Sequence, residues 1–171
     1  MVNGKTINDN GTSNDEGRQT FTISAFSENH IGLLNRITII FTRRLVNIDS
    51  LTVSGSAIPG VHKFTIVVHD YREKVEKVVS QIEKLVEVLR AFYHTEDEVI
   101  HQEIALYKVP TKALIDGNKL EEIIRLHHAR IIEVKPEYTV IQLTGHKEET
   151  QALFSELNNY GLLQFTRSGR I

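Results

Sequence analysis

The chain has 171 residues, of which 40% are hydrophobic and 25% charged, and its formal net charge at pH 7 is −2. This composition is ordinary for a globular protein, and the slight acidity excludes a global electrostatic attraction to nucleic acid or anionic lipid. The chain contains no Cys, which excludes disulfides, a thiolate nucleophile and a zinc site with sulfur ligands. We therefore expect a cytoplasmic protein, with no membrane partner because its apolar runs are too short to cross a bilayer.

The first 18 residues differ in composition from the rest of the chain. They are rich in Asn, Gly, Asp and Ser and nearly free of apolar side chains. They also lack the apolar core of a signal peptide. A segment of this kind buries too little apolar surface to order itself, so we expect a disordered leader over residues 1–18.

Residues 19–95 show the order strand, helix, strand, strand, helix, strand. Apolar residues alternate with polar ones where strands are expected and recur every three or four positions where helices are expected. In chain order, we predict a strand over 20–25, a helix over 33–44, strands over 46–54 and 64–68, a helix over 75–86 and a strand over 88–94.

Two local features within this unit carry their own predictions. The alternation of the strand over 46–54 slips near Asp49 and Ser50, where one inserted residue, a β-bulge, would restore it. Asp70 and Glu73 have the spacing of a helix N-cap and its reciprocal partner. We therefore expect a bulge in the second strand and a capping box at the start of the second helix.

The acidic run 95–98 is the expected boundary, and after it the same order returns. The second set of elements is predicted over 104–109 (strand), a helix around 120–127, 130–134 (strand), 138–144 (strand), a helix around 152–157 and 162–166 (strand). Two such patterns predict an α+β protein with two ferredoxin-like βαββαβ domains, over residues 19–95 and 96–171.

Both predicted domains are small, and both expose the edges of their sheets. Domains of this size bury a modest core and often gain stability by association. A sheet with helices on one face also leaves edge strands that pair readily with another copy. The sequence therefore predicts an obligate homodimer.

The helix over 33–44 begins just after Asn29 and Gly32 and is followed by Asn47. Unpaired N–H groups at a helix start bind a carboxylate, Gly32 allows close approach, and the amide of Asn47 can accept from an ammonium group. This arrangement suits a zwitterionic amino acid, whose aliphatic tail would be favoured by Ile31, Leu33 and Leu34. The alternative, which spacing alone favours, is that Asn29 only caps the helix and Gly32 only permits packing.

Two parts of the chain resemble one known family. Residues 21–90 resemble the ACT domain of the small, regulatory subunit of acetolactate synthase, through Glu28-Asn29, Gly32, the run 47–53 and the run 84–90. The later residues resemble the C-terminal domain of that family, through the runs 103–106, 131–134 and 167–169. The run Asn-Ile-Asp-Ser-Leu-Thr-Val at 47–53 is quite specific, whereas the ACT pattern alone is generic.

The resemblance implies a non-catalytic subunit in branched-chain amino-acid biosynthesis. Such a subunit binds and activates a large catalytic subunit, which uses thiamine diphosphate, magnesium and FAD, and it confers feedback inhibition by valine. No cofactor is expected in this chain itself. An apolar pocket separates aliphatic side chains by only about 1–3 kcal/mol per methylene, so leucine and isoleucine stay open as effectors.

The same resemblance implies the place of the effector. It would lie at an interface between two ACT domains, where Asn29 and Gly32 of one chain face Asn47 of the other, with Ser54 nearby. Leu45 stands where the family usually has Gly at the end of the helix. A Leu in the left-handed conformation costs about 1–2 kcal/mol, so we expect the turn before Asn47 to depart from the family geometry.

Other classes of function are weighed on the same residues. A βαββαβ domain can also bind RNA through aromatic residues on its central strands, but the strands here carry mainly Thr, Ile and Val. Another ACT-type amino-acid-sensing regulator is a further alternative. We predict no catalytic residue, because no acid–base pair is apparent, and no metal site, because the adjacent His127 and His128 point to different helix faces.

Overall fold

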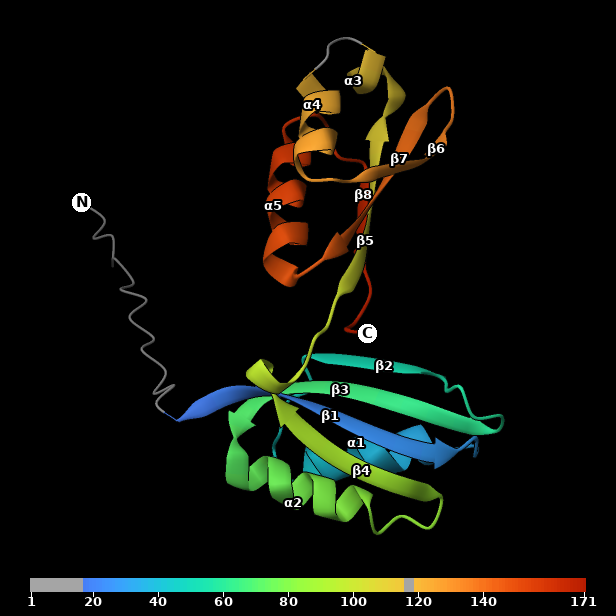
Figure 1. Cartoon of the computed structure of the whole chain (residues 1–171), viewed down its shortest axis with the longest axis vertical. Helices are drawn as coiled ribbons and strands as arrows, with labels where there is room; N and C mark the ends of the chain where they lie inside the picture. Colours follow the sequence, from blue (N-terminus) through green and yellow to red (C-terminus); the bar gives the residue numbers. More distant parts are fainter. Residues whose placement is uncertain (1–16, 116–118) are drawn as a thin grey trace, which may run out of the picture.

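The computed structural model describes residues 17–115 and 119–171, so the leader predicted over 1–18 lies outside the described residues except at Gly17 and Arg18. The described chain forms two units, one above the other in Figure 1. Each unit is a four-stranded antiparallel sheet with helices on one face. The α+β fold with two βαββαβ patterns is therefore confirmed.

The first unit (18–95) has the strand order β2-β3-β1-β4. Central β1 pairs antiparallel with both β3 and β4, which places its alternate side chains against the two helices. The bounds are β1 Arg18–Glu28, α1 Leu33–Arg43, β2 Ser50–Gly55, β3 Val61–Tyr71, α2 Arg72–Ile82 and β4 Val88–Thr95.

The core of the first unit lies between its sheet and its helices. Phe21, Ile23 and Ala25 alternate along β1 onto the helix face and are fully buried. They meet an apolar stripe from the two helices, which includes Ile37 on α1 and Val78 on α2. The opposite face of this sheet carries no helix (Figure 1).

The second unit (103–167) repeats the topology, with the strand order β6-β7-β5-β8. Its core is separate from that of the first unit and centres on Tyr107, Ile141 and Leu153. The bounds are β5 Glu103–Pro110, α3 Thr111–Ile115, α4 Lys119–Leu126, β6 Arg130–Val134, β7 Tyr138–Gly145, α5 Lys147–Asn158 and β8 Gln164–Arg167. The short helix α3 and the 3₁₀ turn η1, Glu96–Glu98, were not predicted.

Two predicted features of α2 are wrong. The helix ends at Ile82 rather than continuing to 86, and Val86 is 94% exposed. The N-cap is Tyr71, with no side-chain cap, so Asp70 and Glu73 form no capping box. Buried Asp70 instead accepts hydrogen bonds from the Tyr71 backbone at 2.8 Å and from Lys74 at 3.2 Å.

The bulge predicted near Asp49 and Ser50 is present at the start of β2. Ser50 pairs with Val67, and the Asp49 N–H also donates to the Val67 carbonyl at 2.9 Å, so two residues oppose one. Strand β2 begins at Ser50 and keeps an unbroken register with β3 through Gly55. The extra residue explains the slip in alternation, because Val46 and Ile48 pack on the core before the bulge and Leu51 packs on the same core after it. Register shifts also occur between β1 and β4 and between β6 and β7.

The loop that leads from α1 to Asn47 is held by a left-handed residue. Leu45 has φ 53°, its N–H donates to Thr42 at 3.1 Å, and the Val46 N–H donates to Phe41 at 3.1 Å. These two bonds make a Schellman motif, which normally prefers Gly at the left-handed position. The expectation that Leu45 would change this turn is therefore wrong, because the chain keeps the left-handed turn.

The carboxyl end of the chain lies at the junction of the two units (Figure 1). Gln102 and Ile171 exchange backbone hydrogen bonds of 3.1 and 3.0 Å, and Arg170 forms an ion pair with Glu96 at 3.0 Å. Gly169 lies so close to the hydroxyl groups of Ser50 and Thr52 that a Cβ would collide with them. The last residues thus contact both the linker and β2.

Candidate functional site

The predicted site begins at the first turn of α1, which no side chain caps. Gly32 is the N-cap residue, with φ 84°, a conformation that favours glycine. Asn29 is not the cap; its side chain is exposed, and its backbone N–H donates to Gly60 at 3.3 Å. The Leu33 N–H already donates to the His30 carbonyl at 3.3 Å, so the start of α1 presents the remaining N–H groups of its first turn and a partial positive charge to solvent.

The apolar neighbours of this turn differ strongly in exposure. Ile31 is 97% exposed and Leu34 is 45% exposed, so both are available to a ligand or to another chain. Leu33 is only 2% exposed and belongs to the hydrophobic core. Its predicted role in lining the pocket is corrected, because its side chain faces the sheet rather than solvent.

Asn47 lies beyond the opposite end of α1. Its amide donates to Asp49 at 3.3 Å and is exposed, and Ser54 is exposed on edge strand β2. Helix α1 has 11 residues, so at 1.5 Å per residue its two ends are about 16 Å apart. One chain therefore does not bring Asn29 and Asn47 together, and a pocket that uses both needs a second chain.

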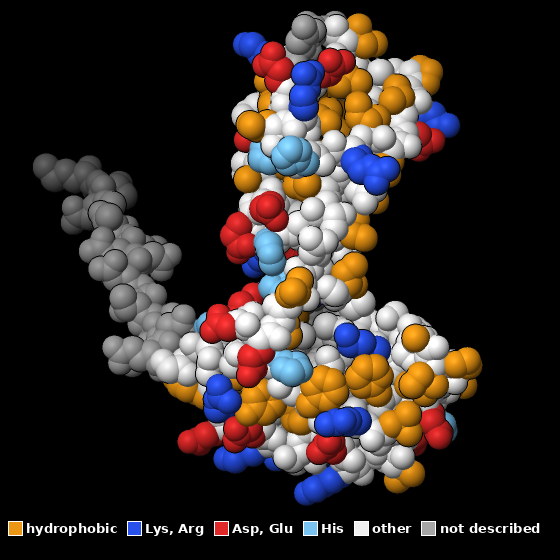
Figure 2. Space-filling model, in the orientation of Figure 1, with side chains coloured by type: hydrophobic (Ala, Val, Ile, Leu, Met, Phe, Trp, Pro, Cys, Tyr) orange, Lys and Arg blue, Asp and Glu red, His pale blue; other side chains and the backbone are white. Residues whose placement is uncertain are grey.

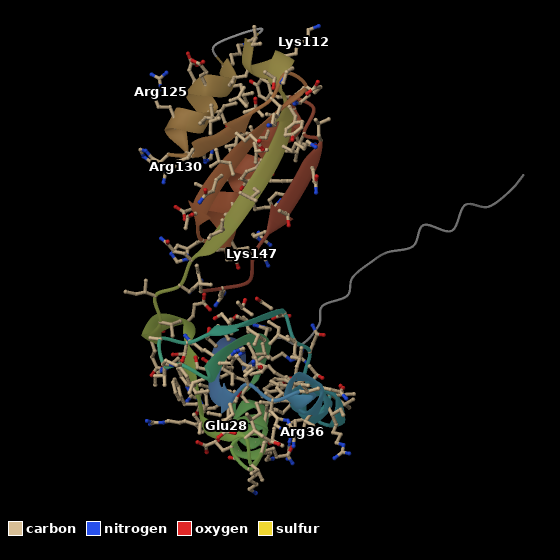
Figure 3. The ribbon with its side chains drawn as sticks, turned by 90° about the vertical axis from the view of Figure 1, so that its right-hand side faces the viewer. Glu28, Arg36, Lys112, Arg125, Arg130 and Lys147 are labelled. Atoms are coloured by element: carbon tan, nitrogen blue, oxygen red, sulfur yellow. The ribbon has the colours of Figure 1, made fainter. Side chains whose placement is uncertain are left out.

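Charged residues surround the start of α1. Arg36 forms an ion pair with Glu87, whose backbone carbonyl accepts from the Glu28 N–H at 3.0 Å. The hydrogen bond from Arg36 lowers the pKa of Glu87 below its ordinary value, and the charge of His30 adds a smaller effect. Figure 3 shows Glu28 and Arg36 in the part of the first unit away from the junction. Sequence reasoning missed this pair because the two residues are distant in the chain.

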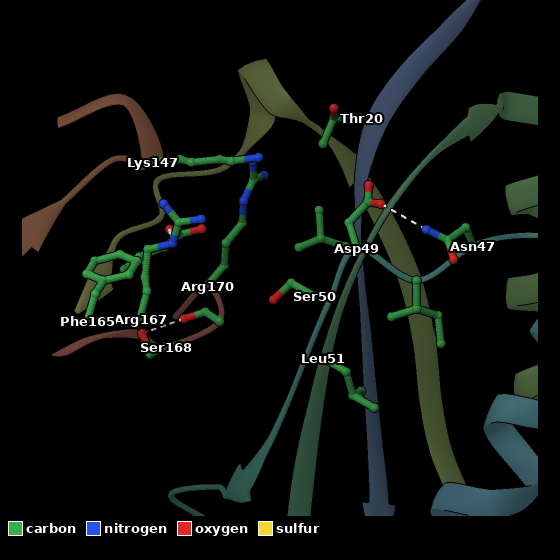
Figure 4. A pocket seen from close by; sticks show the side chains of 14 residues that line it. Thr20, Asn47, Asp49, Ser50, Leu51, Lys147, Phe165, Arg167, Ser168 and Arg170 are labelled. Carbon is green, nitrogen blue, oxygen red and sulfur yellow. Dashed lines mark hydrogen bonds and ion pairs between the residues drawn. The ribbon is translucent and has the colours of Figure 1, made fainter. Parts of the chain in front are cut away.

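A hollow with a volume of about 710 Å³ lies at the junction of the two units. One wall is the segment 47–51 with Thr20, and the other carries Glu103, Lys147 and the tail 167–170 (Figure 4). The basic residues of this second wall are Lys147, Arg167 and Arg170, and none of them was predicted as a site residue. In the part of the chain that the structure describes, no group of three or more His, Cys, Asp or Glu side chains could hold a metal ion.

Comparison with known proteins decides the family. A family model described as the small subunit of acetolactate synthase matches residues 102–171, and one described as an AHAS small subunit-like ACT domain matches residues 23–90. A Bacillus subtilis acetolactate synthase small subunit is 35% identical over 142 residues, which is 82% of each chain. This chain belongs to the acetolactate synthase small-subunit family.

Other relatives agree with that assignment. An acetolactate synthase small subunit from Mycolicibacterium smegmatis is 33% identical over 153 residues, covering 90% of this chain and 89% of the relative. The crystal structure of an acetolactate synthase small subunit from Thermotoga maritima superposes with a TM-score of 0.80 at 26% identity, covering 90% of this chain and 95% of the other. The family is that of a regulatory subunit with an ACT domain, and none of the described helices is long and apolar enough to span a membrane.

Proposed function

We propose that this acetolactate synthase small subunit binds and activates the catalytic subunit and makes it sensitive to inhibition by valine. The catalytic subunit would supply the chemistry, with thiamine diphosphate, magnesium and FAD, while this chain supplies regulation. The observation that carries the proposal is the half-site at α1, where an uncapped helix start lies beside exposed Ile31 and Leu34.

The chemistry of that half-site suits the carboxylate end of an amino acid. A carboxylate placed before Gly32 would accept from the free N–H groups of α1 and gain from the helix dipole. No neighbouring atom lies within 4 Å of the place where a Cβ of Gly32 would be, so the backbone is open to a ligand. Asn47 of a second chain would then complete the site by binding the ammonium group.

Regulation follows if valine binds one arrangement of the dimer better than another. A ligand shared by two chains binds only where both halves are correctly placed, so it shifts the population toward that arrangement. A coupling free energy of about 1–3 kcal/mol would change the activity response several-fold to a hundredfold. Leucine or isoleucine could occupy the same pocket with a modest change in affinity.

The test is reconstitution with the catalytic subunit. We expect this chain to retain that subunit in a pull-down, to raise the rate of acetolactate formation, and to make the rate fall on addition of valine. Valine sensitivity of the catalytic subunit alone, or a rate unchanged by this chain, would reject the proposal. Calorimetry of the small subunit alone with valine, leucine and isoleucine would then rank the effectors.

One observation bears on the RNA-binding alternative. Phe26 on β1 and Phe92 on β4 stack with ring centroids 6.1 Å apart, and the Arg90 guanidinium lies 5.5 Å from the Phe92 ring. Stacked aromatic residues with a cation can hold bases, yet they equally suit a protein contact. The net charge of −2 argues against RNA, and we expect no salt-dependent RNA binding in a filter assay.

A further inference from the structure

We propose that the cleft between the two units binds a small multivalent oxyanion, such as a phosphate ester or a polycarboxylate. This site shares Asn47 with the amino-acid site proposed at α1, but it is argued from other residues and does not depend on that proposal. The cleft has a volume of about 710 Å³, which lies in the range of small-molecule sites. Its walls come from both units, so a ligand there would touch both (Figure 4).

Lys147 is the first residue that points to an anion. It begins α5, at the end of the second unit nearest to the first unit (Figure 3), and its side chain extends into the cleft (Figure 4). Within the described residues, Lys147 makes no ion pair. It also lies at the start of α5, where the positive end of the helix dipole disfavours a cation. An anion in the cleft would relieve both effects.

Two arginines on the same wall are already held in place. Arg167 is paired with buried Glu103 at 3.1 Å and donates to Thr150 at 3.2 Å, while Arg170 is paired with Glu96 at 3.0 Å. Each guanidinium has five N–H donors, so these contacts fix the side chains and leave donors for a ligand. Groups fixed in this way bind an oxyanion with little loss of side-chain entropy.

The opposite wall offers a hydroxyl group without a partner. The Ser50 Oγ is buried and makes no hydrogen bond to any described residue. A buried hydroxyl in this state is unfavourable, and a hydrogen bond to a ligand oxygen would remove that penalty. The cleft also contains the carboxylates of Asp49 and Glu103; Glu103 is neutralised by Arg167, and Asp49 accepts from Asn47 at 3.3 Å.

Figure 2 shows histidine and acidic side chains gathered on the surface around the linker between the units. The rings of His101 and His146 lie 4.9 Å apart. Burial, and then the charge of Arg170, lower the pKa of His101. The lowered pKa favours the neutral form of His101, while Glu96, 3.6 Å from its ring, acts in the opposite direction. We therefore place the measurement at neutral pH, where the anion must be held by the lysine and the arginines.

The test uses the full chain and calorimetric titration with pyrophosphate and with citrate, at an ionic strength held constant with sodium chloride. We expect binding of at least one anion, and an affinity about tenfold weaker in Lys147→Gln, because one charge-assisted contact is lost. Lys119→Gln is the matched control, since Lys119 is also an exposed first residue of a helix in the same unit but lies outside the cleft. Circular dichroism of each variant without anion establishes that it is folded.

The outcomes separate the sources of the anion and decide the proposal. Heat from pyrophosphate alone would assign the site to phosphate groups, and heat from both anions would assign it to multivalent oxyanions in general. Absence of heat with either anion at millimolar concentration would overturn the proposal. Equal affinity of the wild type and Lys147→Gln would overturn it as well, because the anion would then bind elsewhere.

Discussion

Leu45 has a backbone conformation that most side chains avoid. It is 85% exposed, so its side chain gains little from packing in the described chain, and its φ of 53° is left-handed. The same Schellman motif ends α4, where His128 has φ 52° and Ala129 donates to Ile124 at 2.9 Å. Both units thus end the helix before their second strand in the same way, although neither uses glycine.

Substitution of Leu45 by glycine is expected to stabilise the chain. Glycine removes the strain of the left-handed conformation, which is worth about 1–2 kcal/mol. Because glycine also makes the unfolded chain more flexible, part of this gain is lost, and we expect the free energy of unfolding to rise by about 1 kcal/mol. The midpoint of urea unfolding at unchanged slope measures this gain. His128→Gly serves as the comparison, and a fall in the Leu45→Gly midpoint would contradict the explanation.

The asparagines of the proposed effector site give a second prediction at this scale. Replacing Asn29 or Asn47 by Ala should raise the valine concentration needed for half-inhibition by about tenfold, because one polar contact of about 1.4 kcal/mol is lost. Activation of the catalytic subunit without valine should be unchanged. Asn158→Ala, an exposed asparagine at the end of α5, is the control. Full valine sensitivity in both site variants would reject the assignment.

The elements around the start of α1 are joined by an ion pair between distant parts of the chain. Arg36 on α1 meets Glu87 in the loop between α2 and β4, and Glu28 at the end of β1 donates to the same loop. Because the Glu87 carboxyl has its pKa lowered chiefly by Arg36, the charged form is favoured in the folded state. This pair holds the helix start against its loop.

The depressed pKa of Glu87 predicts a pH dependence. A carboxyl group with a lower pKa in the folded state stabilises the fold above its unfolded pKa of 4.5, and that contribution is lost as the pH falls below 4.5 through the folded value. Glu87→Gln should therefore lose stability relative to wild type at pH 7, and the difference should shrink as the solution is acidified below pH 4.5. Thermal melts across this range test the sign, and a difference that grew on acidification would refute it.

The molecule exposes apolar side chains, and each of its two sheets ends in edge strands. In the lower unit of Figure 2, hydrophobic side chains form a row on the surface. Edge strand β2 carries Val53, which is 40% exposed, and every residue of edge strand β6 is exposed, including Ile132 and Val134. Edges of this kind pair with other chains unless they are covered.

We therefore predict a homodimer in solution, the form that the proposed valine site requires. Light scattering should give twice the chain mass of 19.5 kDa. Val53→Lys should weaken association, because a lysine on an edge strand opposes pairing, whereas Ser155→Lys on the exposed face of α5 should not. A monomeric mass of the wild type near neutral pH would contradict the prediction.

The sequence alone determined the order and type of most elements, the fold class and the family resemblance. The periods of a strand (2 residues) and of a helix (3.6 residues) are local properties of the sequence. The alternation of apolar residues at 20–25 and the apolar stripe of α1 could therefore be identified from the sequence alone. The run 47–53 is likewise local. The sequence alone was therefore enough to locate the start of α1 near Asn29 and Gly32, and to place Asn47 after its end.

Only the tertiary structure decided what each of these residues faces. Burial of Leu33, the end of α2 at Ile82 and the pairing of Arg36 with Glu87 all depend on contacts between segments distant in the chain. The same holds for the cleft, whose walls come from both units and the carboxyl-terminal tail. Periodicity specifies which side of an element is apolar, but the packing of one element on another sets which groups meet and which stay open to a ligand.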